Sequence, residues 1–185
     1  MAEYYLISQL PSLDGISDNT PLPITEERFT ELCNQILGKR SREAMNKLTL
    51  SPPKNSESSG SAFIDAWNER ERELRFALGK VRSEKMKKAF DTENRIFPVE
   101  YIKAASTAIE IENPMEAEKY LNGYRLGILE TLRPMDSFSE DYIFYYGLKL
   151  KLLLRIRQFD TKSGEKAYKN IYNSILNGDR LEAKQ

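Results

Sequence analysis

One stretch of the chain, residues 61–90, places its apolar side chains on a single narrow stripe of a 3.6-residue helix. A pattern of this length predicts one long amphipathic helix over about 61–90. A helix of this kind must bury its stripe against other elements, so the predicted fold class is all-α, a helical bundle. The stripe consists of Phe63, Trp67, Leu74, Leu78 and Val81, with Ala66 and Ala77 beside it.

Arg70 is the one position on this stripe that does not suit a hydrophobic core. An unpaired guanidinium is expensive to bury, so the side chain must reach solvent, pair with a carboxylate or face another subunit. Reaching solvent or pairing internally is the simpler interpretation. The alternative is that arginines of this segment bind acidic groups on a partner, because arginine is enriched at interface hot spots. On that hypothesis the candidate partner contacts are Arg70, Arg72 and Arg75, together with Tyr4 and Tyr5.

The segment 69–73 alternates Glu and Arg. Helical spacing pairs Glu69 with Arg72 and Glu71 with Arg75, and each such pair contributes only about 0.2–0.5 kcal/mol. The run is therefore typical of a solvated helix face. The basic residues that follow suit the negative end of the helix dipole, and a nucleic-acid or lipid surface is the alternative. They are Lys80, Arg82, Lys85, Lys87 and Lys88; Lys39, Arg40 and Arg42 form a second basic group.

Composition limits the chemistry that this chain can perform. It contains no histidine, which removes the commonest neutral-pH base and the commonest metal ligand. Its one cysteine, Cys33, falls on the apolar face of a predicted helix, so we expect a buried, unreactive thiol and a reducing compartment. The formal net charge of zero gives no general support for binding nucleic acid.

Candidate active-site motifs are equally scarce. The Gly38-Lys39 pair lacks the upstream glycine and the preceding strand of a P-loop. Carboxylate chemistry would have to use acids whose spacing does not set them apart, such as Glu110, Glu112 or Asp141. We therefore predict no catalytic, cofactor-binding or metal-binding residue, and a protein that is not an enzyme.

The remaining sequence predicts shorter helices. Thr25 is a candidate N-cap for a helix that ends near Gly38 and buries Phe29, Leu32, Cys33 and Ile36. Residues 3–10 form either a short strand or a first helical turn, and we expect an ordered, packed, extended arm. Further helices are predicted over 41–48, from Pro98 onward, over 114–132, over 139–158, and over about 167–175.

The predicted organisation is a single structural domain. Residues 1–48 supply an N-terminal arm and helices, 49–61 a flexible linker or loop, and 62–185 the helical core. The helix over 142–159 is apolar on about three sides, which predicts a central position in the bundle. No signal peptide and no bilayer-spanning run opens or interrupts the chain, so we expect a soluble, cytoplasmic protein.

Three segments resemble an uncharacterised bacterial protein family encoded among the genes of vacuolar/archaeal-type (V/A-type) ATPases. They are Tyr4-Tyr5-Leu6-Ile7-Ser8-Gln9-Leu10-Pro11-Ser12-Leu13, Trp67-Asn68-Glu69-Arg70-Glu71-Arg72-Glu73-Leu74-Arg75, and Lys149-Leu150-Lys151-Leu152-Leu153-Leu154-Arg155 leading to Phe159-Asp160. The resemblance implies a component or accessory of the rotary ATPase, peripheral to the inner membrane through that complex. It supplies no catalytic or binding residue.

A more distant similarity links this family to the all-helical ATPase component that seats the central stalk on the membrane rotor ring, known as the C/d component. The resemblance thus implies partners among the stalk or rotor subunits and no small-molecule substrate. The alternative function is an independent regulatory or nucleic-acid-binding helical module.

Overall fold

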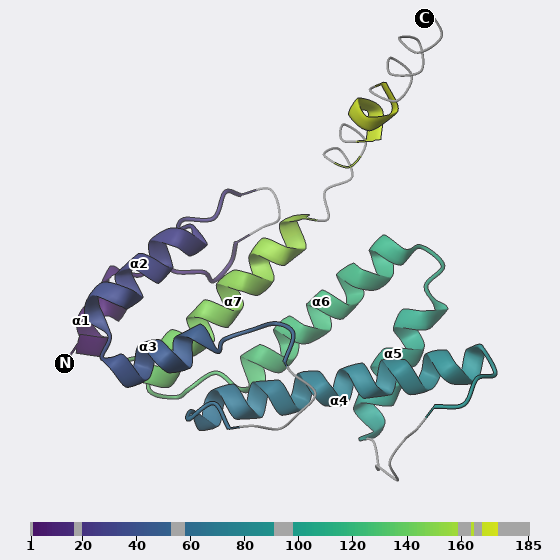
Figure 1. The fold of residues 1–185 in the computed structure, drawn as a ribbon, viewed down its shortest axis with the longest axis horizontal. Helices are drawn as coiled ribbons and strands as arrows, with labels where there is room; N and C mark the ends of the chain where they lie inside the picture. Colours follow the sequence, from purple (N-terminus) through teal and green to yellow (C-terminus); the bar gives the residue numbers. More distant parts are fainter. Residues whose placement is uncertain are drawn as a thin grey trace, which may run out of the picture.

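The computed structural model describes residues 2–16, 20–52, 58–90, 98–158, 164 and 168–173. All regular structure among these residues is helical, so the all-α prediction is confirmed. Figure 1 shows α4 running along one side of the body, with α5 and α6 packed against it. The helices are α1 (Ala2–Gln9), α2 (Glu26–Ile36), α3 (Lys39–Asn46), α4 (Ala62–Lys85), α5 (Val99–Glu110), α6 (Pro114–Thr131) and α7 (Glu140–Gln158).

Four helix starts follow directly from local sequence signals. The Thr25 hydroxyl accepts from the backbone N–H of Arg28 at 3.2 Å and caps α2, as predicted. Ser61 caps α4 in the same way, and Asn113 caps α6 just before Pro114. Ser139 Oγ accepts from the backbone N–H of Tyr142 at 3.2 Å, which fixes the start of α7.

The prediction of an extended N-terminal arm is wrong, because Ala2–Gln9 forms the helix α1. Its apolar and aromatic run was too short to assign by periodicity, and packing decides the conformation. Leu6 is completely buried among residues of α2 and α7, and a helical turn lets it point inward while its neighbours face solvent.

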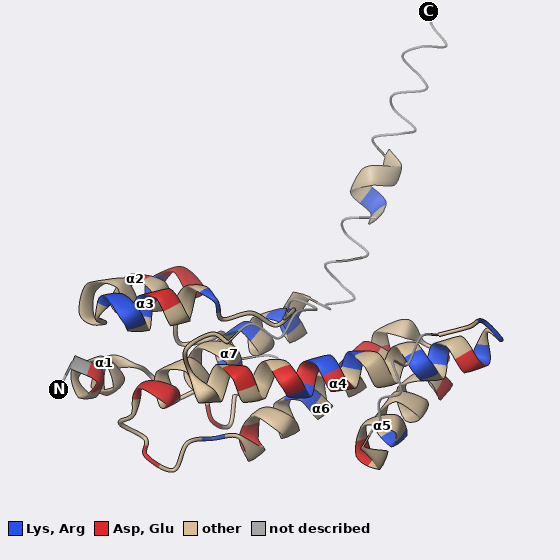
Figure 2. Ribbon diagram, turned by 60° about the horizontal axis from the view of Figure 1, so that its bottom comes forward, with Lys and Arg blue, Asp and Glu red and all other residues tan. Residues whose placement is uncertain are grey.

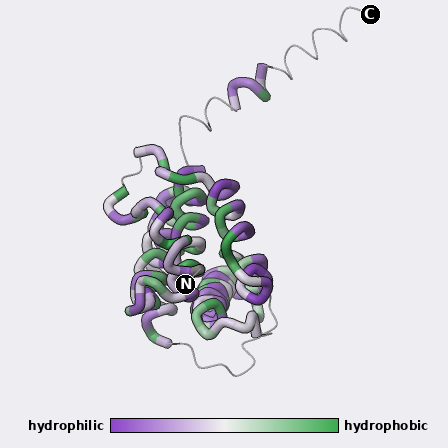
Figure 3. Tube along the Cα trace, turned by 90° about the vertical axis from the view of Figure 1, so that its left-hand side faces the viewer, coloured by the Kyte–Doolittle hydropathy of each residue, from purple (hydrophilic) through white to green (hydrophobic). Residues whose placement is uncertain are grey.

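Helix α7 is the centre of the molecule, as its apolar pattern predicts. One face contributes Phe144, Tyr145 and Leu148 to a core shared with α3, α4, α5 and α6. The other contributes Ile143, Tyr146 and Leu150 to a second core shared with α1 and α2. Figure 3 shows hydrophobic and hydrophilic stretches alternating along the helices, as amphipathic helices require.

The described ends of the predicted linker are fixed against α4. Trp67 Nε1 donates to the Thr49 carbonyl at 3.2 Å, and Arg75 Nη2 donates to the Leu50 carbonyl at 3.0 Å. On the other side, Asp65 accepts from Ser58 Oγ and from the Ser59 N–H, each at 2.7 Å. Residues 53–57 lie outside the described part of the chain.

The predicted C-terminal helix lies partly outside the described residues. Positions 168–173 are helical, which agrees with the pattern. Tyr168 and Tyr172 are exposed there, with their ring centroids 6.1 Å apart.

Candidate partner-binding surface

Helix α1 directs two tyrosines away from the body of the protein. Leu6 is buried and holds the helix in place, while Tyr4 is 59% exposed and Tyr5 is 61% exposed. Both tyrosines were candidate partner contacts, and the structure places them in solvent, where a partner can reach them.

The Tyr4 ring stacks on Phe138, which lies in the connection between α6 and α7. The ring centroids are 4.7 Å apart and the ring planes meet at 30°. Phe138 is itself half exposed, and Met135 in the same connection is fully exposed. Contiguous exposed apolar groups mark interaction sites more often than isolated ones. We call Tyr4, Tyr5, Met135 and Phe138 the aromatic surface.

The connection that carries Phe138 is held by its own hydrogen bonds. Asp136 Oδ1 accepts from the backbone N–H of Phe138 at 2.9 Å, and Ser139 Oγ donates to the Asp136 carbonyl at 2.8 Å. These hydrogen bonds fix the backbone that carries the Phe138 ring.

A cleft of about 170 Å³ adjoins the aromatic surface. Ile7 lies one helical turn after Tyr4, and Tyr142 lies four residues after Phe138, so the cleft continues the same junction between α1 and α7. Its wall combines apolar and aromatic side chains with one cation and one carboxylate. The lining is Ile7, Leu10, Pro11, Ser12, Leu13, Asp14, Tyr142, Tyr145, Tyr146 and Lys149.

Lys149 ties the three elements around this cleft together. Its Nζ lies 2.5 Å from Asp14 Oδ1 on the segment after α1 and 2.7 Å from Glu130 Oε1 on α6. It also contacts Tyr145 Oη at 3.2 Å, and Tyr145 donates to Glu130 at 2.8 Å. A second anchor is the Tyr146 hydroxyl, which donates to the Pro11 carbonyl at 2.8 Å. The polar groups of the cleft wall are thus hydrogen-bonded to one another.

The pKa values of this network follow from these contacts. The hydrogen bond from Lys149 holds the pKa of Asp14 below its ordinary value. Burial alone lowers the pKa of Lys149, but its hydrogen bonds to Asp14, Glu130 and Tyr145 outweigh burial and raise it. Burial raises the pKa of Tyr145 to about 12. Lys149 is therefore a charged structural cation at neutral pH and not a nucleophilic amine.

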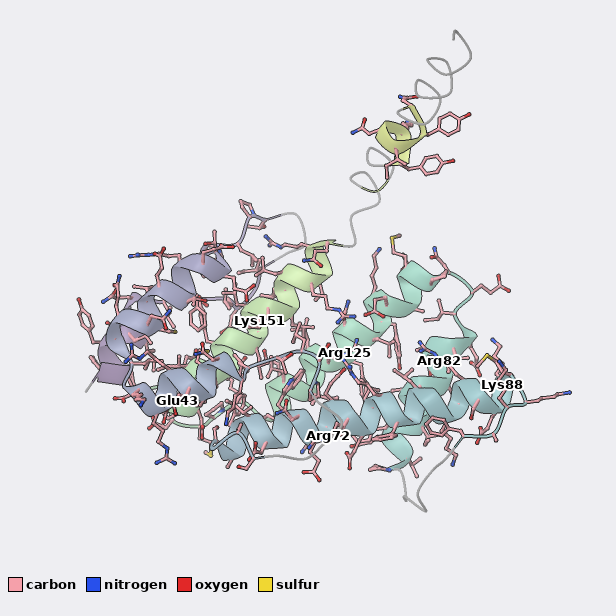
Figure 4. All side chains as sticks on the ribbon, viewed as in Figure 1. Glu43, Arg72, Arg82, Lys88, Arg125 and Lys151 are labelled. Atoms are coloured by element: carbon pink, nitrogen blue, oxygen red, sulfur yellow. The ribbon has the colours of Figure 1, made fainter. Side chains whose placement is uncertain are left out.

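The three candidate arginines lie on α4, away from the aromatic surface and in different surroundings. Arg75 is bound inside the chain: its Nε donates to Glu71 at 2.8 Å and its Nη2 donates to the Leu50 carbonyl. Arg70 is half-buried within electrostatic reach of Tyr101 and Glu73. Arg72 is half-buried on α4, where Figure 4 labels it. Burial raises the pKa of Asp65, but the hydrogen bonds from Ser59 and Ser58 outweigh burial and lower it, and the charge of Arg72 adds a smaller effect in the same direction. Figure 2 shows the alternating acids and bases along this helix.

The charge at the centre of the buried stripe is Glu71, not Arg70. Glu71 is 1% exposed and accepts from Arg125 on α6, another buried side chain. The i, i+4 pair of Glu71 with Arg75 is confirmed, but at the edge of the core and not on a solvated face. The sequence carried this signal, since Glu71 follows Trp67 by four residues and precedes Leu74 by three. Arg125 and Lys149 had no such signal, because their partners are distant in the chain.

Two other clefts carry charged side chains of both signs. The larger, about 500 Å³, lies beside the C-terminal half of α7. Its cations Lys151 and Arg155 pair with Glu26 and Glu118. The other, about 370 Å³, lies where α3 meets the starts of α4 and α7, and bases and acids share its lining.

The described residues contain no group of three or more His, Cys, Asp or Glu side chains that could hold a metal ion. Cys33 is buried, as predicted, and burial raises the pKa of its thiol to about 12. Within the described part of the chain no helix is both long and apolar enough to cross a bilayer.

These features define an all-α protein with an exposed aromatic surface where α1 meets the connection between α6 and α7. Residues 89–179 match the model of an uncharacterised family, described as a protein of unknown function (DUF2764). The match takes in α5, α6 and α7, and with them Phe138 and the side of the cleft formed by α7. No curated protein matches the chain, and no solved structure does.

Proposed function

We propose that this protein is a non-enzymatic helical subunit or assembly factor of a V/A-type rotary ATPase, acting as an adaptor between stalk and rotor. The observation that carries the proposal is the aromatic surface, where Tyr4 and Phe138 stack while both remain half exposed. The place of this surface in the ATPase comes from the sequence resemblance described above.

The adaptor role needs rigid helices and exposed contact groups, and it needs no chemistry. The buried polar groups around the cleft are occupied with each other, which favours a structural role for them. Partners would be other ATPase subunits, and the protein would lie in the cytoplasm, peripheral to the inner membrane through the complex.

The alternative, a nucleic-acid-binding module, would need the two basic groups to act as one patch. The basic residues of α3 lie near the start of α4, where Arg40 and Lys47 share a cleft with Ser61. Lys88 follows the other end of α4, as Figure 4 shows. The second group begins at Lys80, 19 residues after Ser61, so at 1.5 Å per residue α4 separates the two groups by about 28 Å or more. This separation favours the adaptor role; strongly salt-dependent binding of DNA or RNA would instead favour the alternative.

The direct test is capture of the tagged protein from lysate and detergent-solubilised membranes of its own host, with the captured chains identified by mass spectrometry. Enrichment of stalk or rotor subunits is expected, and the Tyr4→Ser/Phe138→Ser variant should lose it. A matched control is Met86→Ser/Val99→Ser, which removes two exposed apolar side chains elsewhere. Failure to recover any ATPase subunit under gentle conditions would overturn the proposal.

The arginine hypothesis needs a different variant. Arg75→Glu would place a second carboxylate beside Glu71 and disturb the core, so loss of binding would be uninformative. Arg72→Glu tests a side chain that lies outside this buried cluster. Undiminished capture by the folded Arg72→Glu protein would remove Arg72 from the interface.

A further inference from the structure

We infer that the aromatic surface and its adjoining cleft bind a basic amphipathic segment of another protein, which inserts one bulky apolar side chain into the cleft. The inference deepens the proposed function and rests on it only in treating this surface as a binding site. It specifies the partner by chemistry: an apolar anchor flanked by Lys or Arg.

The cleft is large enough for one amino-acid side chain but smaller than a typical metabolite-binding site. Its volume of about 170 Å³ lies below the roughly 300–1,000 Å³ that small-molecule sites occupy. Apolar side chains of Ile7, Leu10 and Tyr142 line it, and each is half-buried. Interface hot spots are typically single side chains seated in pockets of this kind and ringed by other contacts.

The aromatic surface supplies that ring of contacts. Tyr4 lies three residues before Ile7, and Phe138 lies four residues before Tyr142, so both rings lie next to the cleft. The two ring centroids are 4.7 Å apart without any partner. A partner that covers both rings would bury apolar area without first ordering them. A rigid aromatic pair beside a pocket is therefore a preformed docking surface.

The charge around this surface selects a basic partner. Residues 1–16 contain the acids Glu3 and Asp14 and no Lys or Arg, and residues 133–141 contain the acids Asp136, Glu140 and Asp141 and one base, Arg133. Arg133 lies 3.6 Å from Asp14 Oδ2 and 3.9 Å from Glu130 Oε2, so these two carboxylates offset its charge. Figure 2 shows the acidic position on α1.

Two of these acids, Asp136 and Glu140, form no ion pair among the described residues, and the hydrogen bond that Asp136 accepts from the Phe138 N–H leaves its negative charge unneutralised. In contrast, Asp14 pairs with Lys149, and Asp141 accepts from Ser61 Oγ at 3.1 Å. Asp136 and Glu140 flank Phe138 in sequence by two residues on each side, so a Lys or Arg of a partner that covers the Phe138 ring would be attracted to them. Glu140 also lines the neighbouring cleft with Arg40 and Lys47.

The test uses two synthetic amphipathic peptides with leucines on one helical face, one with lysines on the other face and one with glutamates. Binding to the full chain is measured by fluorescence anisotropy at low and moderate salt. The lysine peptide should bind at least about tenfold tighter than the glutamate peptide, and salt should narrow the difference. Equal binding, or preference for the glutamate peptide, would overturn the inference.

Two variants separate the cleft from the charges. Ile7→Trp fills the cleft and should weaken the lysine peptide about tenfold. Asp136→Lys/Glu140→Lys should reverse the peptide preference, and Glu110→Lys/Glu112→Lys is the matched control because it reverses two exposed acids at the end of α5. Unchanged binding by a folded Ile7→Trp protein would overturn the inference. If Ile7→Trp fails to fold, the Asp136→Lys/Glu140→Lys variant tests the inference by itself, and an unreversed peptide preference would overturn it.

Sedimentation of the unliganded protein tests the other occupant, a second copy. A dimer that Phe138→Ser dissociates would overturn the basic-partner inference. Failure of the ATPase proposal alone would give a different result. The lysine peptide would still bind more tightly than the glutamate peptide, but no ATPase subunit would be captured. Conversely, the Ile7→Trp and Asp136→Lys/Glu140→Lys variants could still capture ATPase subunits. That result would support the ATPase proposal and overturn the inference about the basic partner.

Discussion

Arg125 on α6 donates to both carboxylate oxygens of Glu71 on α4, with Nε 3.0 Å from Oε2 and 3.2 Å from Oε1. Glu71 also accepts from Arg75, so two guanidinium groups hold one carboxylate that is 1% exposed. This cluster fixes the register of α4 against α6 inside the core, where a displaced charge would be unpaired.

Removing the carboxylate should therefore destabilise the protein strongly. Glu71→Leu leaves Arg125 buried without its main partner, and the expected loss in free energy of unfolding is about 3–5 kcal/mol. Urea unfolding followed by far-UV circular dichroism measures it. The exposed Glu69→Gln is the control on the same helix, with an expected change within about 0.5 kcal/mol.

Replacing Arg125 as well should recover part of the free energy of unfolding that Glu71→Leu loses. Glu71→Leu/Arg125→Met replaces both charges by apolar groups, so the double variant should lose less than Glu71→Leu and Arg125→Met lose together. Strict additivity in this double-mutant cycle would show that the two side chains are not coupled.

Gly147 on α7 marks a close approach between helices. A Cβ at this position would lie 2.8 Å from Leu48 Cδ2 and 3.0 Å from Phe29 Cε1, both in the packed core. Gly147→Ala should therefore destabilise the protein by about 1–3 kcal/mol from overpacking, offset in part by the higher helix propensity of alanine.

Gly123→Ala provides the matched comparison for Gly147→Ala. Gly123 lies in α6, where nothing would meet a Cβ within 4 Å, so this change should stabilise by about 0.5–1 kcal/mol. Thermal unfolding of both variants checks the pair. Equal shifts of both melting temperatures in the same direction would contradict the close approach at Gly147.

The Asp14–Lys149 contact should make stability depend on pH in acid. The pKa of Asp14 is lowered in the folded protein, so its contribution is fully present above the ordinary Asp pKa of about 3.9 and is lost as the pH falls through the lower folded value. Asp14→Asn should thus destabilise at pH 6, with the difference from the native protein shrinking toward pH 2. Chemical unfolding across this range measures it; a difference that stays constant with pH would contradict the pairing.

Cys33 should be inert until the protein unfolds. It is buried and its pKa is raised to about 12, so little thiolate exists at pH 8 and a reagent has no access to it. We expect no reaction with an aromatic disulfide reagent in native buffer and one equivalent in guanidinium chloride. Rapid native labelling would show that α2 opens readily.

Much of the fold could be predicted because its signals are local. The caps at Thr25 and Ser139, the long stripe of α4 and the apolar α7 each depend on residues a few positions apart. The N-terminal arm was wrong because eight residues are too few for periodicity to separate strand from helix. The candidate Tyr4 is exposed, but its partner Phe138 could not be predicted, since no short-range pattern connects positions so far apart.

The sequence by itself determined the all-α class, most helix boundaries and the absence of histidine-based chemistry, because these depend on composition and on spacing within a few turns. Only the tertiary structure decided that Glu71 and not Arg70 lies in the core, and that Arg75 binds within the chain. It alone brought α1 beside the start of α7 and so created the aromatic surface. The physical reason is that burial and charge pairing depend on which helices meet, and that is settled by packing across the whole chain.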